Sequence, residues 1–336
     1  MNKHLSLFLC LLFLLISNPI KAQDLTSLSL EELGEIDVFP GTVLDTHIHQ
    51  KNDMMFALYQ SYSEMDSLGR ETKNISINDT LSQYMVSPTH MSMRMTMFHA
   101  MYAYSDNLTF AFMTHFMDMS MKHVTRMKQE FTTQSQGIGD SAITLNYLFN
   151  ESHNGKNHWI MHTSFIIPTG SIDEKGTTPL GYVQLPYAMQ LGQGSYQLKL
   201  GMDYTLSQQN YIVSANFFAQ SPINTNEANY KVGDSFSANL TYLYSLTNIM
   251  SLDAHINYMW QNSISGFDER LNSNIVPTAN TNNYGGKNLN INVGVSWLLP
   301  YRNKISVSYV KPIWQNIRGI QLQKNEQINL SWEITL

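Results

Sequence analysis

The chain has 336 residues, of which 43% are apolar and only 14% are charged, and its formal net charge is −6. A soluble enzyme normally carries about a quarter charged residues, and here Asn, Gln, Ser, Thr and Tyr replace them. The chain has no Lys/Arg-rich run that could contact phosphates, so DNA and RNA are not expected as partners.

The first 22 residues have the layout of a secretory signal peptide. Lys3 precedes an apolar stretch from Leu5 to Ile16, Pro19 interrupts it, and Ala22 offers a small residue for cleavage. This stretch is shorter than the roughly 20 residues of a membrane-spanning helix. Cys10 is the only cysteine of the chain, and it lies inside this segment. Lipidation of Cys10 is a minor alternative; otherwise the mature chain has no thiol for a disulfide, a thiolate metal site or a nucleophile.

Residues 23–45 are expected to form a periplasmic arm. Leu25 to Leu33 reads as a short amphipathic helix, in which Ser29 is the cap and Glu32 completes a capping box. Such a helix either plugs the pore or rests under it, or else the segment is a solvated arm. The sequence leaves both interpretations open.

After residue 45 the dominant pattern is the alternation of apolar and polar residues, which is typical of strands. Between Ser195 and Leu206, for example, every even position is apolar. The pattern predicts twelve strands, at residues 52–64, 91–104, 108–118, 139–149, 158–167, 195–206, 210–220, 233–246, 250–261, 288–299, 303–311 and 326–336.

These segments favour a membrane barrel over a soluble sandwich. A strand needs about 9–11 residues to cross the hydrocarbon layer, whereas sandwich strands usually have about five or six residues and carry Lys and Glu on their outer face. Lipid cannot satisfy an open sheet edge. The sequence therefore predicts an all-β fold, an antiparallel transmembrane β-barrel of about twelve strands over residues 46–336.

The connections alternate in length. Residues 105–107, 207–209, 247–249 and 300–302 are tight, whereas residues 65–90, 119–138, 168–194, 221–232 and 262–287 are long. In bacterial barrels the short turns face the periplasm and the long loops face outward. We therefore expect a protein of the bacterial outer membrane, in contact with its lipid. The last strand ends on Leu336, which resembles the signal read by the barrel-assembly machinery, an expected partner.

Methionine is concentrated in one region, because eleven of the twenty methionines lie between Met85 and Met127. In two neighbouring strands Met and His occupy every second position, so their side chains project from one face. The first row is Met91, Met93, Met95, Met97, His99 and Met101, and the second is Met113, His115, Met117, Met119, Met121 and His123. The intervening Phe110, Phe112 and Phe116 suit lipid, so both rows are predicted to face the lumen.

These rows suggest a metal site. Thioether sulfur is a soft ligand that favours Cu(I) or Ag(I), and imidazole adds a nitrogen donor. His47 and His49 could form a second cluster near the mouth of the barrel. The alternative is that methionine only packs or lines the lumen, since it is a flexible apolar filler. No other cofactor is expected.

The predicted function is a channel or transporter that binds or passes a soft metal ion. The alternatives are a passive pore for small hydrophobic or aromatic compounds and a structural barrel without transport. His162-Thr163-Ser164 resembles the His-x-Ser pair of an outer-membrane phospholipase, but here His162 and Ser164 are expected to face inward and no Ser-Asn-Gly follows. The chain is therefore predicted not to be an enzyme. Gly137 to Asp140 is interpreted as a turn before a strand.

Several stretches together carry a resemblance to a known family. They are Leu28 to Leu33, His47 to His49, Pro88 to Met95, Met101 to Asp106, Met121 to Arg126, Gly137 to Asp140, Pro168 to Asp173 and Leu191 to Ser195. In combination they resemble a methionine-rich branch of the outer-membrane barrels of the meta-pathway phenol-degradation family, often called transporters. The resemblance implies a bacterial outer-membrane barrel with a transport role, for a hydrocarbon or for a heavy metal. Lys51 to Met54 departs from the Gly-Glu-Trp-Met that many relatives carry there.

Overall fold

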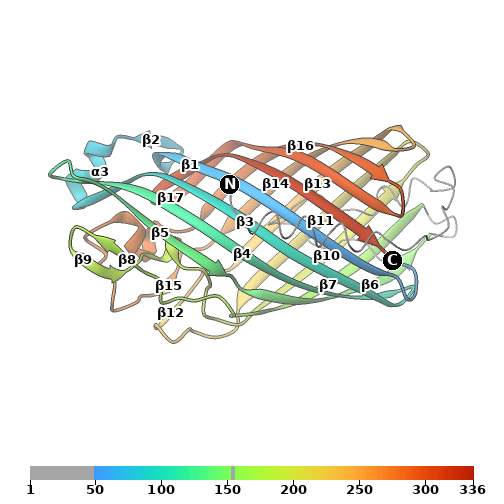
Figure 1. Cartoon of the computed structure of the whole chain (residues 1–336), viewed down its shortest axis with the longest axis horizontal. Helices are drawn as coiled ribbons and strands as arrows, with labels where there is room; N and C mark the ends of the chain where they lie inside the picture. Colours follow the sequence, from blue (N-terminus) through green and yellow to red (C-terminus); the bar gives the residue numbers. More distant parts are fainter. Residues whose placement is uncertain (1–48, 153–155) are drawn as a thin grey trace, which may run out of the picture.

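The computed structural model describes residues 49–152 and 156–336. The predicted signal peptide, the arm at residues 23–45 with its helix, and His47 lie outside the described residues. Within them, one antiparallel sheet closes into a barrel (Figure 1). Its wall is formed by β1 (Met54–Glu71), β3 (Val86–Ser105), β4 (Leu108–Thr125), β6 (Ser141–Glu151), β7 (Asn157–Ile167), β10 (Gln197–Ser207), β11 (Tyr211–Pro222), β13 (Ser235–Thr247), β14 (Met250–Gln261), β16 (Gly286–Leu299) and β17 (Asn303–Thr335).

The last element, β17, crosses the barrel wall twice. Its first half pairs with β16 and its second half pairs with β1, which closes the ring. The two halves also contact each other: the Tyr309 hydroxyl donates to the Glu326 carboxylate at 2.9 Å, and Trp332 Nε1 donates to Asn303 Oδ1 at 3.1 Å. Between them, Gly319 takes a left-handed φ of 60°. A closed ring with only antiparallel pairings needs an even number of strands. The eleven wall elements of the described residues supply the predicted twelve strands, because β17 counts as two.

The connections separate by length between the two ends of the barrel (Figure 1). One end carries the four predicted tight turns and the last residue of the chain. The other end carries the long loops, with β2 (Lys73–Ile75), α3 (Ile77–Gln83), β8 (Lys175–Thr178), β9 (Gly181–Gln184), η2 (Tyr187–Met189), β12 (Tyr230–Lys231), β15 (Ser265–Gly266), η3 (Pro277–Ala279) and η4 (Thr281–Asn283). We refer to these as the turn end and the loop end.

Two of the predicted loops are in part strands. Residues 119–138 contain the end of β4 and then β5 (Glu130–Ile138), which pairs with β4. Residues 65–90 contain the end of β1, β2, α3 and the start of β3. With 18 to 20 residues, β1, β3 and β4 exceed the roughly 9–11 needed to cross the hydrocarbon, so they extend beyond it at the loop end. Arg94 and Asp118 face outward there, and the alternation signal weakens because no lipid requires apolar side chains.

Helix α3 is held at the loop end by its own cap and by the turn after β4. Ser76 Oγ accepts from the Asp79 N–H at 3.1 Å, and Asp79 Oδ2 accepts from the Ser76 N–H at 3.2 Å, which makes a capping box. The Arg126 side chain donates to the carbonyls of Ser82 and Tyr84 near the helix C-terminus. Across residues 49–152 and 156–336, no helix combines the length and the apolar character needed to cross a membrane.

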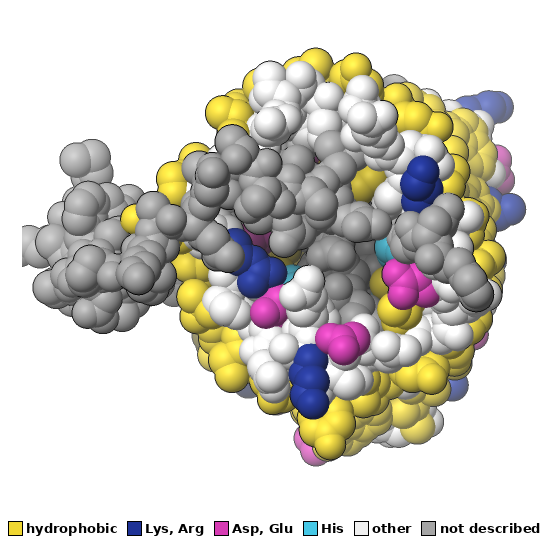
Figure 2. Space-filling model, turned by 90° about the vertical axis from the view of Figure 1, so that its right-hand side faces the viewer, with side chains coloured by type: hydrophobic (Ala, Val, Ile, Leu, Met, Phe, Trp, Pro, Cys, Tyr) yellow, Lys and Arg dark blue, Asp and Glu magenta, His cyan; other side chains and the backbone are white. Residues whose placement is uncertain are grey.

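The predicted inner and outer faces are those of the structure. The outward-facing Phe98, Phe110, Phe112 and Phe116 are exposed, whereas inward-facing Met97, His99 and Met101 are buried. Figure 2, which shows the molecule from its turn end, has apolar side chains around the outer wall and charged side chains at the mouth. Lipid therefore meets a mostly apolar wall, and the polar and sulfur-bearing side chains lie inside.

Candidate functional site

The two Met/His rows lie on the inner wall in direct register across β3 and β4. The opposing pairs are Met91 with Met121, Met93 with Met119, Met95 with Met117, Met97 with His115, and His99 with Met113. His123 lies opposite Pro88. On the next strand, β1, Met55 lies opposite Met101 and Met65 lies opposite Met91. Opposing side chains have Cβ atoms about 4.5–5.5 Å apart, so thioether and imidazole groups face one another along the whole barrel. We call these two rows the Met/His field.

Much of the field is packed. Near the turn end, Met97 and Met101 form a cluster with Met55 and Tyr59. Near the loop end, Met91, Met119 and Met121 form another. The middle of the field is only half-buried, and its members are Met93, Met95, Met113, His115 and Met117. These middle residues are therefore the ones that a solute in the lumen could reach.

The loop between β7 and β10 folds into the lumen and covers the loop-end part of the field. Its residues 185–191, which include η2, place Leu185, Met189 and Leu191 against the methionines there, and all three are at most 5% exposed. We call residues 185–191 the plug. The sequence predicts residues 168–194 as a long loop on the outward side of the barrel. Because this loop has no period-two pattern, the sequence does not show which of its residues turn into the lumen.

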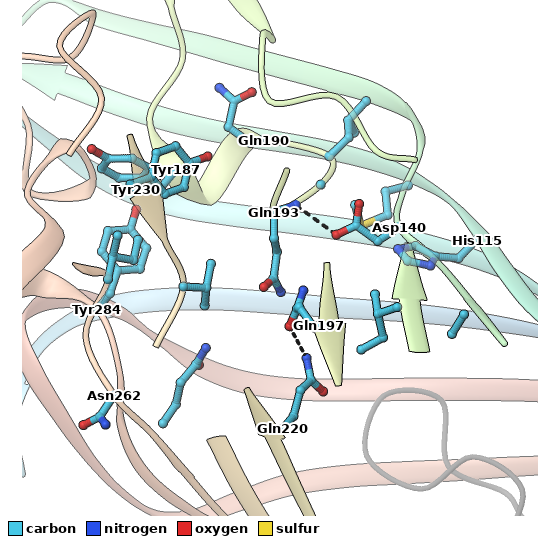
Figure 3. A pocket seen from close by; sticks show the side chains of 18 of the residues that line it. His115, Asp140, Tyr187, Gln190, Gln193, Gln197, Gln220, Tyr230, Asn262 and Tyr284 are labelled. Carbon is cyan, nitrogen blue, oxygen red and sulfur yellow. Dashed lines mark hydrogen bonds between the residues drawn. The ribbon is translucent and has the colours of Figure 1, made fainter. Parts of the chain in front are cut away.

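Asp140 anchors the plug to the wall. It lies where β5 ends and β6 begins, and its Oδ1 accepts from the Gly170 N–H at 3.0 Å, while Oδ2 accepts from the Gln193 N–H at 2.9 Å (Figure 3). Burial raises the pKa of Asp140, despite the two donors that lower it. The backbone of Gly192 passes so close that an added Cβ would lie 2.4 Å from the Gly170 oxygen. The junction at residues 137–140 is therefore more than a turn.

A cavity of about 380 Å³ lies beside the plug. Met113, His115 and Met117 of the field line it, and His115 lies on the side away from the tyrosines (Figure 3). The other side chains around it are mainly tyrosines and amides: Tyr187, Tyr230, Tyr284, Gln190, Gln193, Gln197, Gln220, Gln261 and Asn262. In the described part of the chain the buried Nδ1 of His115 has no hydrogen-bond partner. The cavity thus combines an aromatic side, a sulfur side and several amides.

Three tyrosines from three loops form the aromatic side. The ring of Tyr187 lies 4.8 Å from that of Tyr230 and 5.7 Å from that of Tyr284, in both cases edge to face. The Tyr284 hydroxyl donates to the Thr278 carbonyl at 2.6 Å, and the Tyr187 hydroxyl accepts from the Asp268 N–H at 2.9 Å. Burial raises the pKa of all three phenols, which remain neutral. These three tyrosines could not be predicted from the sequence, because loop residues have no periodicity.

A charged contact joins two of these loops. Arg270, between β14 and β16, pairs with Asp268 at 2.7 Å and also with Asp173 of the loop that carries the plug. The side chain of Asp173 is nevertheless 69% exposed, so this ion pair lies at the surface. The loops over the cavity are therefore linked by tyrosine packing on the inside and by ion pairs at the surface.

On the turn-end side of the cavity the lumen is polar. Asn216, Asn239, Asn257 and Asn290 lie directly opposite one another on β11, β13, β14 and β16. Each amide donates to the next, from Asn239 to Asn216 at 2.6 Å, from Asn257 to Asn239, and from Asn290 to Asn257 at 2.9 Å. All four are at most 8% exposed. We call them the asparagine row.

The remaining candidate residues have structural partners. His162 and Ser164 face inward, as predicted; His162 Nδ1 is 3.0 Å from Asn146 Oδ1, and the Ser164 hydroxyl accepts from Thr144 at 2.8 Å. His49 is buried, and its predicted companion lies outside the described residues. Among residues 49–152 and 156–336, no three His, Cys, Asp or Glu side chains gather as a metal-binding group.

Comparison with known proteins adds a family to this geometry. The family model described as "Putative MetA-pathway of phenol degradation" matches residues 76–318, more than two thirds of the chain. The chain belongs to this family. No curated protein sequence matches this family member.

Solved structures similar to this family member are outer-membrane barrels. An outer membrane channel from Pseudomonas putida F1 matches with a TM-score of 0.64 at 13% identity, covering 89% of this chain and all of that one. The translocator domain of the autotransporter NalP from Neisseria meningitidis has a TM-score of 0.47 at 10% identity, covering 85% and 89%. A FadL homologue of Pseudomonas aeruginosa has a TM-score of 0.41 at 7% identity, covering 84% and 90%. The first likeness gives the fold of an outer-membrane channel, and the protein is a bacterial outer-membrane β-barrel.

Asp140, Gly170 and Gln193 belong to three of the stretches that carry the family resemblance. They are separated in the sequence by up to 53 residues, and they meet at one carboxylate. The motifs were therefore the only signal for this anchor in the sequence. Each motif by itself resembles a turn or a loop, and only the structure shows that the three together anchor the plug.

Proposed function

We propose that this protein is an outer-membrane channel for small, neutral aromatic solutes of the phenol class, and that these bind in the lumenal cavity. The observation that carries the proposal is the cavity itself, at about 380 Å³ between three tyrosines and the Met/His field. Small-molecule sites are typically about 300–1,000 Å³, mostly apolar, with a few polar groups that fix orientation. The description of the family agrees with this class of solute.

The lining suits an aromatic ring that carries a hydroxyl group. Tyr187 and its two partners offer edge-to-face contacts, and the thioethers of Met113 and Met117 offer favourable sulfur–aromatic contacts. Gln193 and Gln220 can exchange hydrogen bonds with a hydroxyl, since an amide both donates and accepts. A cationic solute gains less binding energy from the cavity. Among the lining residues that the structure describes, its one carboxylate partner would be Asp140, whose two oxygens already accept hydrogen bonds from backbone N–H groups.

The test is calorimetric titration of the purified protein with phenol, together with uptake of phenol into liposomes that contain it. Tyr187→Ala removes about 2 kcal/mol of ring contact, so binding weakens by about 30-fold. Tyr182→Ala is the matched control, because Tyr182 is in the same loop but is 72% exposed on β9. Equal affinities of the two variants would contradict the proposal.

A second candidate function is the binding and passage of Cu(I) or Ag(I), which the register of the Met/His field favours. Met95 and Met117 oppose each other, and Met97 and His115 form the next pair along the same two strands. Neighbouring inward positions on one strand are about 7 Å apart, so the three thioethers and the imidazole project from one small area of the inner wall. These are soft ligands that select Cu(I). Repeated pairs along the field would give successive weak sites, which conduction requires.

A Cu(I) competition titration tests this second function, with Zn(II) as the harder comparison ion. Replacing both Met95 and Met117 by Leu should remove the site that these two residues share, so fewer Cu(I) ions bind per chain, whereas the fold is retained because Met and Leu are nearly equal in volume. The matched control replaces Met85 and Met127 by Leu, since these are 53% and 86% exposed and outside the field. Unchanged Cu(I) stoichiometry and affinity in the first variant would exclude Met95 and Met117 as a metal site.

We propose no catalytic role for the barrel. The hydroxyl of Ser164 accepts from Thr144, and the Nδ1 of His162 lies 3.0 Å from Asn146 Oδ1. A hydrolase needs a base within hydrogen-bond reach of its nucleophile. Here the two side chains are engaged with neighbouring strands, which is typical of a polar wall.

A further inference from the structure

Two apolar side chains from strands that are not neighbours meet inside the barrel. Phe218 of β11 and Val310 of β17 are 3% and 1% exposed, and they form a cluster of their own. In the sheet, β13, β14 and β16 lie between these two strands. The contact therefore spans the lumen rather than running along the wall.

The ring of Phe218 is held in place by three residues of the neighbouring wall. Gly201 lies directly opposite it, and an added Cβ there would be 2.2 Å from the Phe218 ring. The ring therefore lies over Gly201, where any side chain would displace it. Lys199 Nζ is 4.3 Å from the ring centroid, a cation–π distance, and the His162 ring centroid is 5.4 Å away. A ring with contacts on several sides has a fixed position.

Phe218 lies between the cavity and the asparagine row along β11. Two residues toward the loop end, Gln220 lines the cavity and donates to Gln197. Two residues toward the turn end, Asn216 is the first member of the asparagine row. Side chains two apart face the same side of a strand. A solute that leaves the cavity toward the turn end therefore meets Phe218 before any amide of the row.

We infer that Phe218 and Val310 form the selective constriction of this channel. A narrow apolar constriction in a polar lumen excludes hydrated ions, because water is readily expelled from it. An ion would have to lose its hydration shell to pass. Compact neutral solutes lose little hydration free energy when they pass it. The inference rests on the proposed channel function, but it does not depend on which solute binds in the cavity.

The test is the single-channel conductance of the refolded full chain in planar lipid bilayers with potassium chloride. Phe218→Ala widens the constriction and should raise the conductance at least about twofold. Val310→Ala should raise it by less, because a smaller side chain is removed. Phe217→Ala is the matched control, since Phe217 is the next residue and is 47% exposed on the lipid face. Equal conductance of Phe218→Ala and Phe217→Ala would overturn the inference.

Whether Phe218→Ala folds is checked by its migration on a gel with and without heating. A second variant covers the case in which it does not fold. Phe218→Trp keeps an aromatic ring and enlarges it, so its conductance should fall below that of the wild type. A folded Phe218→Trp protein with wild-type conductance would also reject the constriction. Failure of phenol binding leaves these arms intact, because ion conductance requires no solute in the cavity.

Discussion

Replacing Asp140 by Ala should release the plug. The carboxylate accepts two backbone hydrogen bonds, from Gly170 at 3.0 Å and from Gln193 at 2.9 Å, and these residues flank the plug on both sides. A hydrogen bond to a charged group contributes about 1.5–3 kcal/mol. The site is half-buried, so water replaces part of the loss. We expect the free energy of plug closure to fall by about 2–4 kcal/mol, so the fraction of molecules with an open plug rises by about 30- to 1,000-fold.

Hydrogen–deuterium exchange of the reconstituted protein measures this change. In Asp140→Ala the amides of residues 185–191 should exchange faster by that factor, while the strands of the wall keep their protection. Asp140→Asn retains one acceptor oxygen and should give an intermediate rate. Asp118→Asn is the control, because Asp118 is exposed on the outward face of β4. Unchanged exchange at the plug in Asp140→Ala would refute the role of this carboxylate.

Three further predictions follow from the same geometry. Gly192→Ala places a Cβ against the backbone of the crossing loop and should weaken plug closure by about 1–3 kcal/mol, seen as faster exchange at residues 185–191. Asn239→Leu breaks two buried hydrogen bonds of the asparagine row and should lower the free energy of unfolding in lipid vesicles by about 2–3 kcal/mol. Burial raises the pKa of Asp140 above its ordinary value of 3.8, so the closed plug binds this proton more tightly than the open one. Closure should therefore be strongest below that ordinary value and weaken as the pH rises through the raised pKa. The protection factors at residues 185–191, which are corrected for the intrinsic pH dependence of amide exchange, should lose this dependence in Asp140→Asn.

The wall of the barrel could be predicted from the sequence because lipid imposes a strict rule on it. Every crossing strand alternates between apolar and polar faces, so the strands, the tight turns and the inward direction of Met97 and His99 were all readable. A tight turn fixes the register of the strands it joins, which is why the two Met/His rows could be set beside each other. The extensions of β3 and β4 at residues 86–90 and 119–125 were missed, because the polar pair His90 and Lys122 lies above the hydrocarbon, where alternation is not required.

The loop-end part of the site was beyond sequence reasoning. Tyr187, Tyr230 and Tyr284 come from three different loops, and their contacts join residues 43 to 97 positions apart. No local periodicity encodes such contacts. The three field residues that line the cavity were named in advance, because they belong to a strand. Asp140 was named only as part of a turn, since its two partners lie in another loop.

The pairing of β1 with the second half of β17 has a consequence for biogenesis. Met55 pairs with Thr335 and Gln60 with Leu330, so this seam joins the first and the last wall strands of the described residues. Before this pairing forms, the sheet is open, and its two edge strands expose unpaired amide and carbonyl groups that promote aggregation. The ring can therefore close only after the second half of β17 has been synthesised and has reached β1.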